Sequence, residues 1–499
     1  MPNDNYIGID LGTSVAKGVL MSDAGVVLAT TSRQLPLETP SPDWAEQEPE
    51  AWWGAVSSIL RELKKAGGFS KVKGIGLSGQ MHGLVCYDDD LNPIRNAIVW
   101  LDRRSNQEVD DILETVGHNQ LYRITGNPVF NGFLLPSLLW VKRNEPRVFG
   151  MTSVVSSPKD FLALQLTGKL RTEPTDALAT GAFDRVANDW SSLVLEAVGL
   201  ERSLFPEVAP TSQPYGGLLP EVAKRFGLPA GIPVYGGSDQ AMGAMGLGLV
   251  KPGQAMVALA TGGQFVVIGE PGLIDNRRRL HTLSHGVEKT GMYMAATLSA
   301  ALSMRWFKEE VIQDTKTSYP DFYYGIQDIP AGSDGVIFHP YLAGERTPYF
   351  NSALRGGFSG LSVAHNQKHL QRAIIEGVSF SMKQCLHVFE QMNMPIRSII
   401  LTGGGAKNPI WQQIMADVLN RSMEISTVTD HSPFGAAVFA KFAPKKFVGL
   451  SSFYKSVINK GEEIKPNPAS VKIYEPIFEE YVSIADAKHR RARRKQRHK

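Results

Sequence analysis

Cysteine is scarce in this chain of 499 residues, where only Cys86 and Cys385 occur. The two lie far apart and lack the spacing of metal ligands, which argues against a disulfide-stapled fold and against a zinc site. Long apolar runs are missing as well, and the N-terminus has no charged segment followed by an apolar run. We therefore expect a cytoplasmic protein that does not contact a membrane.

An excess of positive charge is also missing from most of the chain. The net charge is +3, but residues 488–499 contain eight Lys or Arg and no acid. Subtracting these eight charges leaves −5 for the rest, which lacks the polybasic signature of a nucleic-acid-binding protein, so no nucleic-acid partner is expected. We expect residues 486–499 to be a basic, disordered tail, with weak binding to RNA or an acidic partner as the alternative.

The composition, with 43% hydrophobic and 20% charged residues, is that of an ordinary globular protein. The chain is too long for one typical hydrophobic core, which favours two domains. We place them at residues 1–245 and 246–485.

Common nucleotide-binding loops are absent. No GxxxxGK[ST] segment occurs, and the one GxGxxG pattern, at Gly74, Gly76 and Gly79, lies inside a predicted strand instead of following it, so a dinucleotide site is not expected. The useful residues come next, because Met81 and His82 stand just past the strand end, where open α/β sheets place ligands.

The chain is organised around residues 232–248. Ile232 to Tyr235 is predicted to be a strand, two glycines form a turn, and Asp239 stands at the start of a helix of small residues. Helix starts leave free N–H groups and a positive dipole end, so Asp239 is either a helix N-cap or a neighbour of an anion site.

Two strand–loop–strand units resemble each other. In the first, a strand over residues 6–9 leads into Asp10, Gly12, Thr13 and Ser14; in the second, a strand over residues 255–259 leads into Ala260-Thr-Gly-Gly263. Backbone N–H groups and hydroxyls in such loops suit phosphate, and Asp10 can hold a metal-bound water. The repetition predicts two similarly built domains that face one another, each with a phosphate-gripping hairpin.

Other segments give local predictions. Apolar spacing predicts helices over residues 49–65 and 369–390. Asp102 beside two arginines suggests either polyol or phosphate binding or a surface ion pair. Three glycines at 403–405, between a strand and a helix with Pro409 in its first turn, allow a flat ligand to lie against the backbone.

The ordered set DLGTS, SGQMHG, WxDRR, GGSDQAMGAMG, a second Thr/Gly hairpin, GERTP, GGGAKN and GAA runs from Tyr6 to about Ala440. It resembles the FGGY carbohydrate kinases and, within them, the bacterial xylulokinases. The resemblance implies an α/β, actin-like (ribonuclease H-like) fold of two domains with a catalytic cleft between them. It also implies that the sugar binds mainly to the N-terminal domain and ATP to the C-terminal one.

The resemblance further implies ATP-dependent phosphorylation of D-xylulose to D-xylulose 5-phosphate in pentose catabolism, with Mg²⁺ as cofactor. Asp239 matches the catalytic base, and Asp10 matches the acid that positions the metal. The sugar contacts expected on this basis are Met81, His82, Trp100, Asp102, Asp239 and Gln240. The ATP contacts expected are Thr13, Ser14, Thr261, Gly262, Gly404, Gly405 and Asn408. A homodimer is one allowed assembly.

Three segments depart from the family pattern: Ser137, residues 260–263 and residues 430–434. Alternative functions are a kinase of another ketose or polyol, such as ribulose, fructose or glycerol, and an actin-like ATPase without sugar kinase activity. A third alternative is a catalytically weak relative that acts as a regulator.

Overall fold

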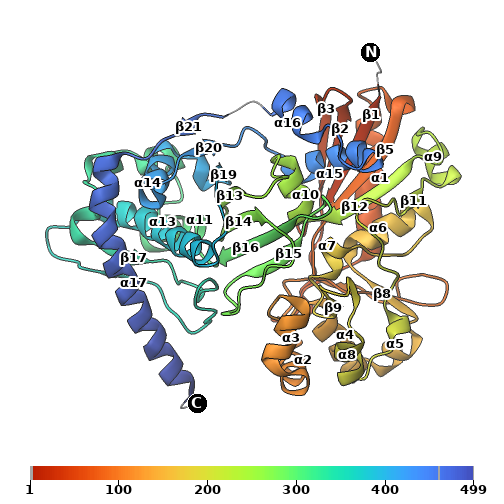
Figure 1. Ribbon diagram of the computed structural model, residues 1–499, viewed down its shortest axis with the longest axis horizontal. Coiled ribbons are helices and arrows are strands. Elements are labelled where there is room, and N and C mark those ends of the chain that lie inside the picture. The colour runs from red at the N-terminus through yellow and green to blue at the C-terminus, as the bar shows by residue number, and fades with distance from the viewer. Residues whose placement is uncertain (1–3, 459–460, 498–499) are drawn as a thin grey trace.

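The computed structural model describes residues 4–458 and 461–497 and has two lobes, each built around one sheet (Figure 1). The N-terminal lobe contains a six-stranded sheet in the order β11-β12-β5-β1-β2-β3. Neighbours β1, β5 and β12 are parallel, and the remaining pairs are antiparallel. The strands are β1 Asn5–Leu11, β2 Val15–Ser22, β3 Val27–Gln34, β5 Val72–Gly79, β11 Gly216–Gly217 and β12 Pro233–Ser238.

The C-terminal lobe repeats this plan in a seven-stranded sheet, β15-β16-β14-β13-β19-β20-β21. Here β13, β19 and β20 are parallel, an antiparallel hairpin precedes them and an antiparallel edge strand follows, as in the first sheet. The predicted duplication is therefore confirmed. The strands are β13 Gln254–Leu259, β14 Gly263–Gly269, β15 His281–Ser284, β16 Gly291–Thr297, β19 Ser398–Thr402, β20 Met423–Ile425 and β21 Glu463–Ile464.

The N-terminal sheet is covered on both faces because its strands alternate. In β1, Ile7, Ile9 and Leu11 pack with α1 (Pro49–Lys64) and α6 (Pro158–Thr167). On the other face, Tyr6 and strand β2 pack against α10 (Asp239–Gly246), α15 (His431–Phe442) and α16 (Leu450–Val457). The helix α1 agrees with the helix predicted over residues 49–65.

Helix α15 packs against the N-terminal lobe. Although it lies inside the segment 246–485, it packs between the strands of the N-terminal sheet and α10, where its blue ribbon stands among the red and orange strands of Figure 1. The contact is backbone to backbone: a Cβ on Gly8 would lie 1.8 Å from the carbonyl oxygen of Pro433, and one on Gly76 would lie 1.8 Å from that of Ala436. Residues 431–457 thus belong to the N-terminal lobe, which local sequence patterns do not reveal.

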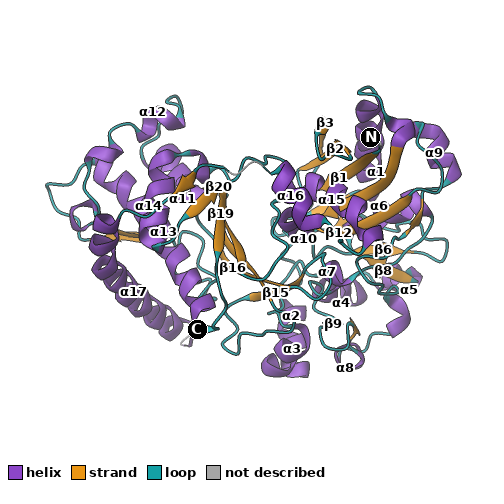
Figure 2. Ribbon diagram, turned by 45° about the horizontal axis from the view of Figure 1, so that its top comes forward, coloured by secondary structure: helices purple, strands orange, loops and turns teal. Residues whose placement is uncertain are grey.

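A helical subdomain extends the N-terminal lobe below its sheet, with its own core around Leu135, Leu138 and Phe183 (Figure 2). It carries several residues of the candidate site on short strands and loops. Its helices are α2 Asn106–Ile112, α3 His118–Thr125, α4 Leu134–Asn144, α5 Pro146–Met151 and α8 Ser192–Ala197. Beside it lie α7 Pro174–Ala177 and the strand pairs β4 Glu46–Gln47 with β7 Ala97–Ile98, β6 Val85–Tyr87 with β8 Val154–Ser156, and β9 Phe183–Asp184 with β10 Asp189–Trp190. Helix α9 Pro220–Phe226 packs against α1 beside the sheet.

The C-terminal sheet is backed by α13 (Gln367–Gln391), which agrees with the helix predicted over residues 369–390, and by α14 (Pro409–Leu419). In the ranges that the structure describes, no helix has both the length and the apolar composition needed to cross a lipid bilayer. Smaller elements of this lobe are α11 Ala301–Trp306, α12 Tyr319–Tyr323, β17 Ile337–His339 and β18 Gly357–Ser359.

The last helix, α17 (Pro468–Arg497), corrects the prediction of a disordered tail for residues 486–497. Tyr481 and Ala485 are fully buried, the Tyr349 hydroxyl donates to Asp486 at 3.0 Å, and the Asn351 amide lies 3.1 Å from His489 Nδ1. These contacts hold the segment on the lobe, and its Ala- and Arg-rich sequence favours the helix. Residues 498–499 lie outside the described part of the chain.

Candidate active site

Asp239 is the first residue of α10, directly after β12. The N-cap is Ser238, whose hydroxyl accepts from the Ala241 amide at 3.3 Å. Of the two alternatives considered for Asp239, the N-cap is therefore wrong. The Asp239 carboxylate does not cap helix α10, because Ser238 does so. Its Oδ1 is buried and finds no hydrogen-bond partner among the described residues.

Burial, together with the nearby Asp10, raises the pKa of Asp239 to about 7, against the opposing hydrogen bond from the Gln240 amide. Asp10 lies at the end of β1, where the Ser78 hydroxyl donates to its Oδ1 at 2.6 Å. Burial raises the pKa of Asp10 as well. The two carboxyls meet because β1, β5 and β12 are parallel neighbours whose carboxyl ends share one edge.

A cavity of about 650 Å³ lies in front of Asp239 and is lined by both lobes. The N-terminal lobe contributes Asp239, Gln240 and the start of α15. The C-terminal lobe contributes Ala260 and Gln264 from its hairpin and Thr402 and Gly403 from the end of β19. Such a place, with several polar groups and a titratable group of perturbed pKa, suits a reacting small molecule.

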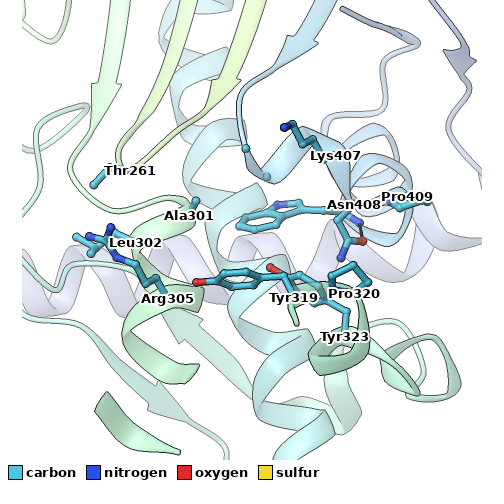
Figure 3. A pocket seen from close by; sticks show the side chains of 13 residues that line it. Thr261, Ala301, Leu302, Arg305, Tyr319, Pro320, Tyr323, Lys407, Asn408 and Pro409 are labelled. Atoms are coloured by element: carbon cyan, nitrogen blue, oxygen red, sulfur yellow. Dashed lines mark hydrogen bonds between the residues drawn. The ribbon is translucent and has the colours of Figure 1, made fainter. Parts of the chain in front are cut away.

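A second cavity of about 450 Å³ adjoins the first, since Lys407 lines both (Figure 3). Four of the residues predicted to bind ATP line it, namely Thr261, Gly404, Gly405 and Asn408. Its wall is mainly apolar and aromatic, which suits a flat heterocycle. Sequence reasoning missed several lining residues, because they come from a segment without a motif: Leu302, Arg305, Tyr319, Pro320 and Tyr323.

The predicted loop residues of this cavity differ in what they contact. The Asn408 side-chain oxygen caps α14, accepting from the Ile410 amide at 2.8 Å and the Trp411 amide at 3.2 Å. A Cβ on Gly404 would meet nothing within 4 Å, whereas one on Gly405 would lie 2.9 Å from Leu259 Cβ. Gly404 therefore leaves the backbone open to a ligand, while Gly405 is required by packing. Gly262 belongs to the adjoining hairpin, where a Cβ would lie 2.6 Å from the Thr297 carbonyl oxygen.

In the first hairpin, the Thr13 hydroxyl is part of a side-chain network. It accepts from Trp100 Nε1 at 2.8 Å and donates to Gln80 Oε1 at 3.1 Å. The structure thereby joins a predicted ATP residue to a predicted sugar residue. Ser14 is exposed, and Trp100 keeps 43% of its surface exposed.

His82 is held as a neutral ring. Its Nδ1 lies 2.6 Å from the Ala179 carbonyl oxygen, which can only accept, so Nδ1 carries the proton and Nε2 is left as an acceptor. The ring stacks on Phe133 with a centroid distance of 4.1 Å. Burial lowers the pKa of His82 to about 4. Met81 beside it is buried in an apolar cluster with Ala179.

Three residues near His82 come from the C-terminal lobe. His281 of β15 lies between Phe130 and Phe350, and its buried Nε2 has no partner in the described part of the chain. The Arg346 guanidinium lies 5.4 Å from the Phe130 ring. Burial, aided by Arg346 and His82, lowers the pKa of His281 to about 3. The sequence singled out GERTP as a motif but gave no signal for His281 or Phe350.

The Asp102 carboxylate is engaged in a buried ion pair. Its side chain is fully buried, pairs with Arg104 at 2.8 Å and accepts from the Ala45 amide at 2.6 Å. Arg104 in turn lies 3.8 Å and 4.8 Å from the rings of Trp44 and Trp140. Both carboxylate oxygens are thus occupied, so the ion-pair alternative fits, although the pair is buried instead of on the surface.

Comparison with known proteins identifies the family. The models of the FGGY family of carbohydrate kinases match residues 5–246 with the N-terminal domain and residues 326–443 with the C-terminal domain. The chain is 36% identical over 478 residues to a xylulose kinase of Lactococcus lactis, covering 95% of each protein. Among solved structures, it is similar to xylulose kinase from Rhodospirillum rubrum, with TM-score 0.92 and 27% identity over 98% of this chain and 100% of that one. It is also similar to gluconate kinase from Lactobacillus acidophilus, with TM-score 0.92 and 25% identity over 98% of each chain. This chain therefore belongs to the FGGY family of carbohydrate kinases, sugar-phosphorylating enzymes whose two-lobed, actin-like α/β fold it shares.

Proposed function

We propose that this kinase transfers the γ-phosphoryl group of ATP to the terminal hydroxyl of D-xylulose and so makes D-xylulose 5-phosphate in cytoplasmic pentose catabolism. The observation that carries the proposal is the buried Oδ1 of Asp239, which has no hydrogen-bond partner among the described residues, at a cavity lined by both lobes. The choice of D-xylulose as the substrate rests on similarity to xylulose kinases, which extends over nearly the whole chain.

Asp239 acts as the general base. Its Oδ1 takes the proton of the attacking hydroxyl, and because burial holds its pKa near 7, about half of the molecules carry the ionised form at neutral pH. A base in this position contributes on the order of 10² to 10⁴ in rate. The rest of the catalysis is positioning and charge neutralisation, as in other phosphoryl transfers.

The nucleotide occupies the C-terminal side. Its base lies in the cavity of about 450 Å³ between Gly404 and Tyr319, and its phosphates extend toward Thr261 and Thr13 in the two hairpins. This assignment agrees with the prediction that the sugar binds mainly to the N-terminal lobe and ATP mainly to the C-terminal lobe. Helix α15 is counted here in the N-terminal lobe.

The residues present fit Mg²⁺. This ion favours one or two carboxylates completed by water and phosphate oxygens, and Asp10 is a single buried carboxylate beside Asp239. The described residues contain no group of three or more side chains suited to a metal, so Asp10 would hold the ion with the nucleotide. When bound, Mg²⁺ neutralises phosphate charge.

The sugar lies between His82 and Asp239. The free Nε2 of His82 accepts from a sugar hydroxyl, and Met81, Trp100 and Gln240 form the wall of the N-terminal side. Arg346 and His281 lie near His82 on the other lobe, since the Arg346 charge lowers the pKa of both histidines. Asp102 is left out of this set because its carboxylate is fully paired.

A second candidate substrate is an aldonic acid such as gluconate. Arg346 favours it, because its guanidinium makes no hydrogen bond to any described side chain and is a ready partner for a carboxylate. The similar gluconate kinase gives this candidate a precedent of the same fold.

A coupled assay of ADP release with Mg-ATP separates these candidates. The panel contains D-xylulose, L-xylulose, D-ribulose, L-ribulose, D-fructose, glycerol and D-gluconate, each with the wild type and with Asp239→Asn. Turnover with D-xylulose above all others, abolished by the substitution, is expected. Preferred turnover of gluconate supports the second candidate, and sugar-independent ATP hydrolysis that survives the substitution rejects both.

A further inference from the structure

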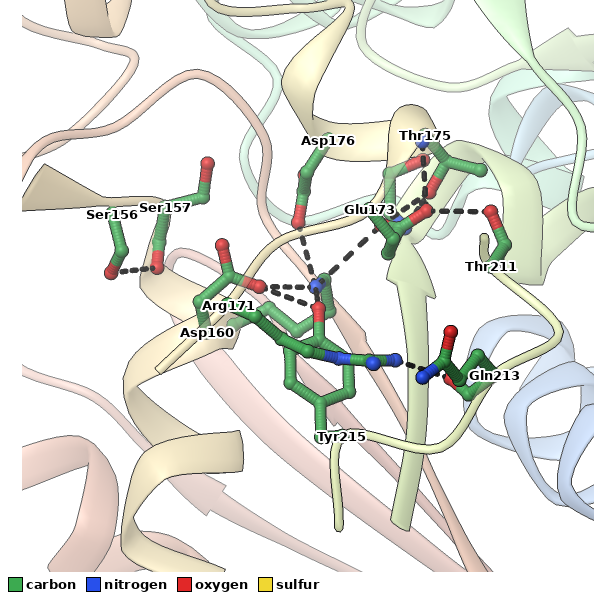
Figure 4. Close-up of polar contacts among 12 residues, drawn as sticks. Ser156, Ser157, Asp160, Arg171, Glu173, Thr175, Asp176, Thr211, Gln213 and Tyr215 are labelled. Carbon is green, nitrogen blue, oxygen red and sulfur yellow. Dashed lines mark hydrogen bonds and ion pairs between the residues drawn. The ribbon is translucent and has the colours of Figure 1, made fainter. Parts of the chain in front are cut away.

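A cluster of buried charges lies directly behind strand β12 (Figure 4). Lys159 of α6 is fully buried, and its ammonium lies 2.6 Å from Asp160, 3.2 Å from Asp176 and 3.6 Å from Glu173. The Tyr215 hydroxyl donates to Asp160 at 2.6 Å. Burying ionic groups costs several kcal/mol per ion, which apolar residues of similar size avoid. Such a cluster therefore needs a reason other than stability alone.

The cluster is connected by hydrogen bonds to two threonines, of which Thr175 leads to strand β12. Glu173 accepts from the Thr175 amide and the Thr175 hydroxyl, both at 2.8 Å, and from the Thr211 hydroxyl at 2.9 Å. A hydroxyl has one proton to donate and two lone pairs that accept. Because Glu173 takes that proton, the lone pairs of Thr175 are turned toward its other neighbour.

That neighbour is the peptide before Asp239. The Ser238 amide donates to the Thr175 hydroxyl at 2.7 Å, and Thr175 is fully buried. The end of β12 also lies flat on the cluster: a Cβ on Gly236 would be 3.1 Å from the Tyr215 ring and 3.2 Å from the Lys159 side chain, and one on Gly237 would be 3.3 Å from the Thr175 hydroxyl. The cluster therefore contacts three consecutive residues that lead into Asp239.

We propose that Glu173 and Thr175 are positioning residues for Asp239: the charged cluster orients the Thr175 hydroxyl, which fixes the Ser238 amide and thereby aims the carboxylate of Asp239 at the cavity between the lobes. Neither residue contacts that cavity, so they act through the backbone. The inference rests on the proposed role of Asp239 as the base. A misplacement of about 1 Å can cost on the order of 10² in rate.

Thr175→Val tests this directly, because it keeps the shape of the side chain and leaves the Ser238 amide without its acceptor. We expect kcat to fall about 10- to 100-fold, while KM for sugar and for ATP changes less than about threefold. Thr175→Ser restores the hydroxyl and is expected to keep kcat within about threefold of the wild type. Glu173→Gln, which removes the charge that orients the hydroxyl, is expected to give a smaller loss of kcat.

Thr180→Val is the matched control. Thr180 is equally buried and follows α7 in the same segment. Among the described residues, its hydroxyl bonds only the Ala177 carbonyl and the Ala182 amide. If Thr180→Val lowers kcat as much as Thr175→Val does, or if Thr175→Ser fails to rescue, the effect is general destabilisation and the proposal is wrong.

Two measurements distinguish a failure of the positioning role from a failure of the proposed function. Amide hydrogen exchange of the peptide 234–245 is expected to quicken in Thr175→Val and not in Thr180→Val, whatever the substrate. If Thr175→Val does not fold, Glu173→Gln carries the same test. An active wild type with an inactive Asp239→Asn and an unimpaired Thr175→Val overturns the positioning role alone, whereas an Asp239→Asn that turns over normally overturns both.

Discussion

At the scale of single residues, Asp239 sets the pH dependence of the reaction. A base must be ionised to accept a proton, and burial holds the pKa of this carboxyl at about 7. We therefore expect kcat/KM for the sugar to rise tenfold per pH unit below about pH 7 and to level off above it. A pH–rate profile with D-xylulose measures this, and a flat profile between about pH 5.5 and 8.5 would contradict the role of Asp239 as the base.

The same carboxyl affects the stability of the protein. Its folded-state pKa lies above the value of about 4 in an unfolded chain, so the folded state binds the proton more tightly. The carboxyl therefore favours folding most below about pH 4, and this contribution is lost as the pH rises to about 7. We expect Asp239→Asn to raise Tm at pH 8 more than at pH 5 while it lowers kcat by on the order of 10² to 10⁴.

Asp102 provides the contrasting control for that experiment. It is buried and paired with Arg104 at 2.8 Å, and breaking a buried ion pair costs about 3–5 kcal/mol. Asp102→Asn is thus expected to lower Tm at both pH values. Thermal unfolding of the two variants side by side gives opposite signs at pH 8, and equal signs would show that Asp239 is better paired than its geometry indicates.

Tyr319 gives a prediction for the nucleotide. Its side chain lines the cavity of about 450 Å³ opposite Gly404, where it is placed to stack on a flat base. Loss of such a contact costs about 1 kcal/mol, so Tyr319→Ala is expected to raise KM for ATP about five- to tenfold and to leave KM for the sugar unchanged. Tyr324→Ala, at a residue 78% exposed, is the control. An equal effect of both substitutions, or an effect on the sugar, would remove Tyr319 from the nucleotide site.

At the scale of elements, the packing of α15 on the N-terminal sheet depends on glycine. A Cβ on Gly76 would lie 1.8 Å from the carbonyl oxygen of Ala436, closer than any real contact. Gly76→Ala is expected to destabilise the protein by more than about 3 kcal/mol, since the helix must move away. Gly54→Ala, on α1 where a Cβ meets nothing within 4 Å, is expected to stabilise it by about 0.5–1 kcal/mol. Urea unfolding of both variants distinguishes a specific close contact from a general effect of the substitution.

The helices and strands also show which features of the fold and the site could be predicted from the sequence. The duplicated hairpins, α1 and α13 were predictable because their signals are local: residue spacing, turn glycines and helix starts. So was the position of Asp10 and Asp239, because both follow strands whose carboxyl ends share an edge. The ion pair of Asp102 was one of two alternatives, but its burial was not predictable, because it depends on the Ala45 amide and on Arg104, which lies near the rings of Trp44 and Trp140. Tyr319 was missed for the same reason, since only the fold brings its loop to Gly404.

At the scale of the whole molecule, the packing of α15 on the N-terminal sheet predicts how fragments of the chain behave. Residues 1–250 contain every strand of the N-terminal sheet but lack the helix that covers one of its faces. We expect this fragment to bind the dye ANS and to unfold without a cooperative transition. Joining residues 427–458 to it through a flexible linker is expected to restore near-ultraviolet circular dichroism and cooperativity. A fragment 1–250 that unfolds cooperatively by itself would show that α15 is dispensable for this lobe.

The same packing of α15 has a consequence for biosynthesis. A ribosome releases the strands around Gly8 and Gly76 long before it makes residues 431–442, so the lobe that carries Asp239 waits with one face open while six of the seven strands of the second sheet are translated. The same helix also brings His431 and Ser432 to the edge of the cavity. Completion of the first lobe and assembly of the cavity are therefore one late event, and a nascent chain remains inactive until that event takes place.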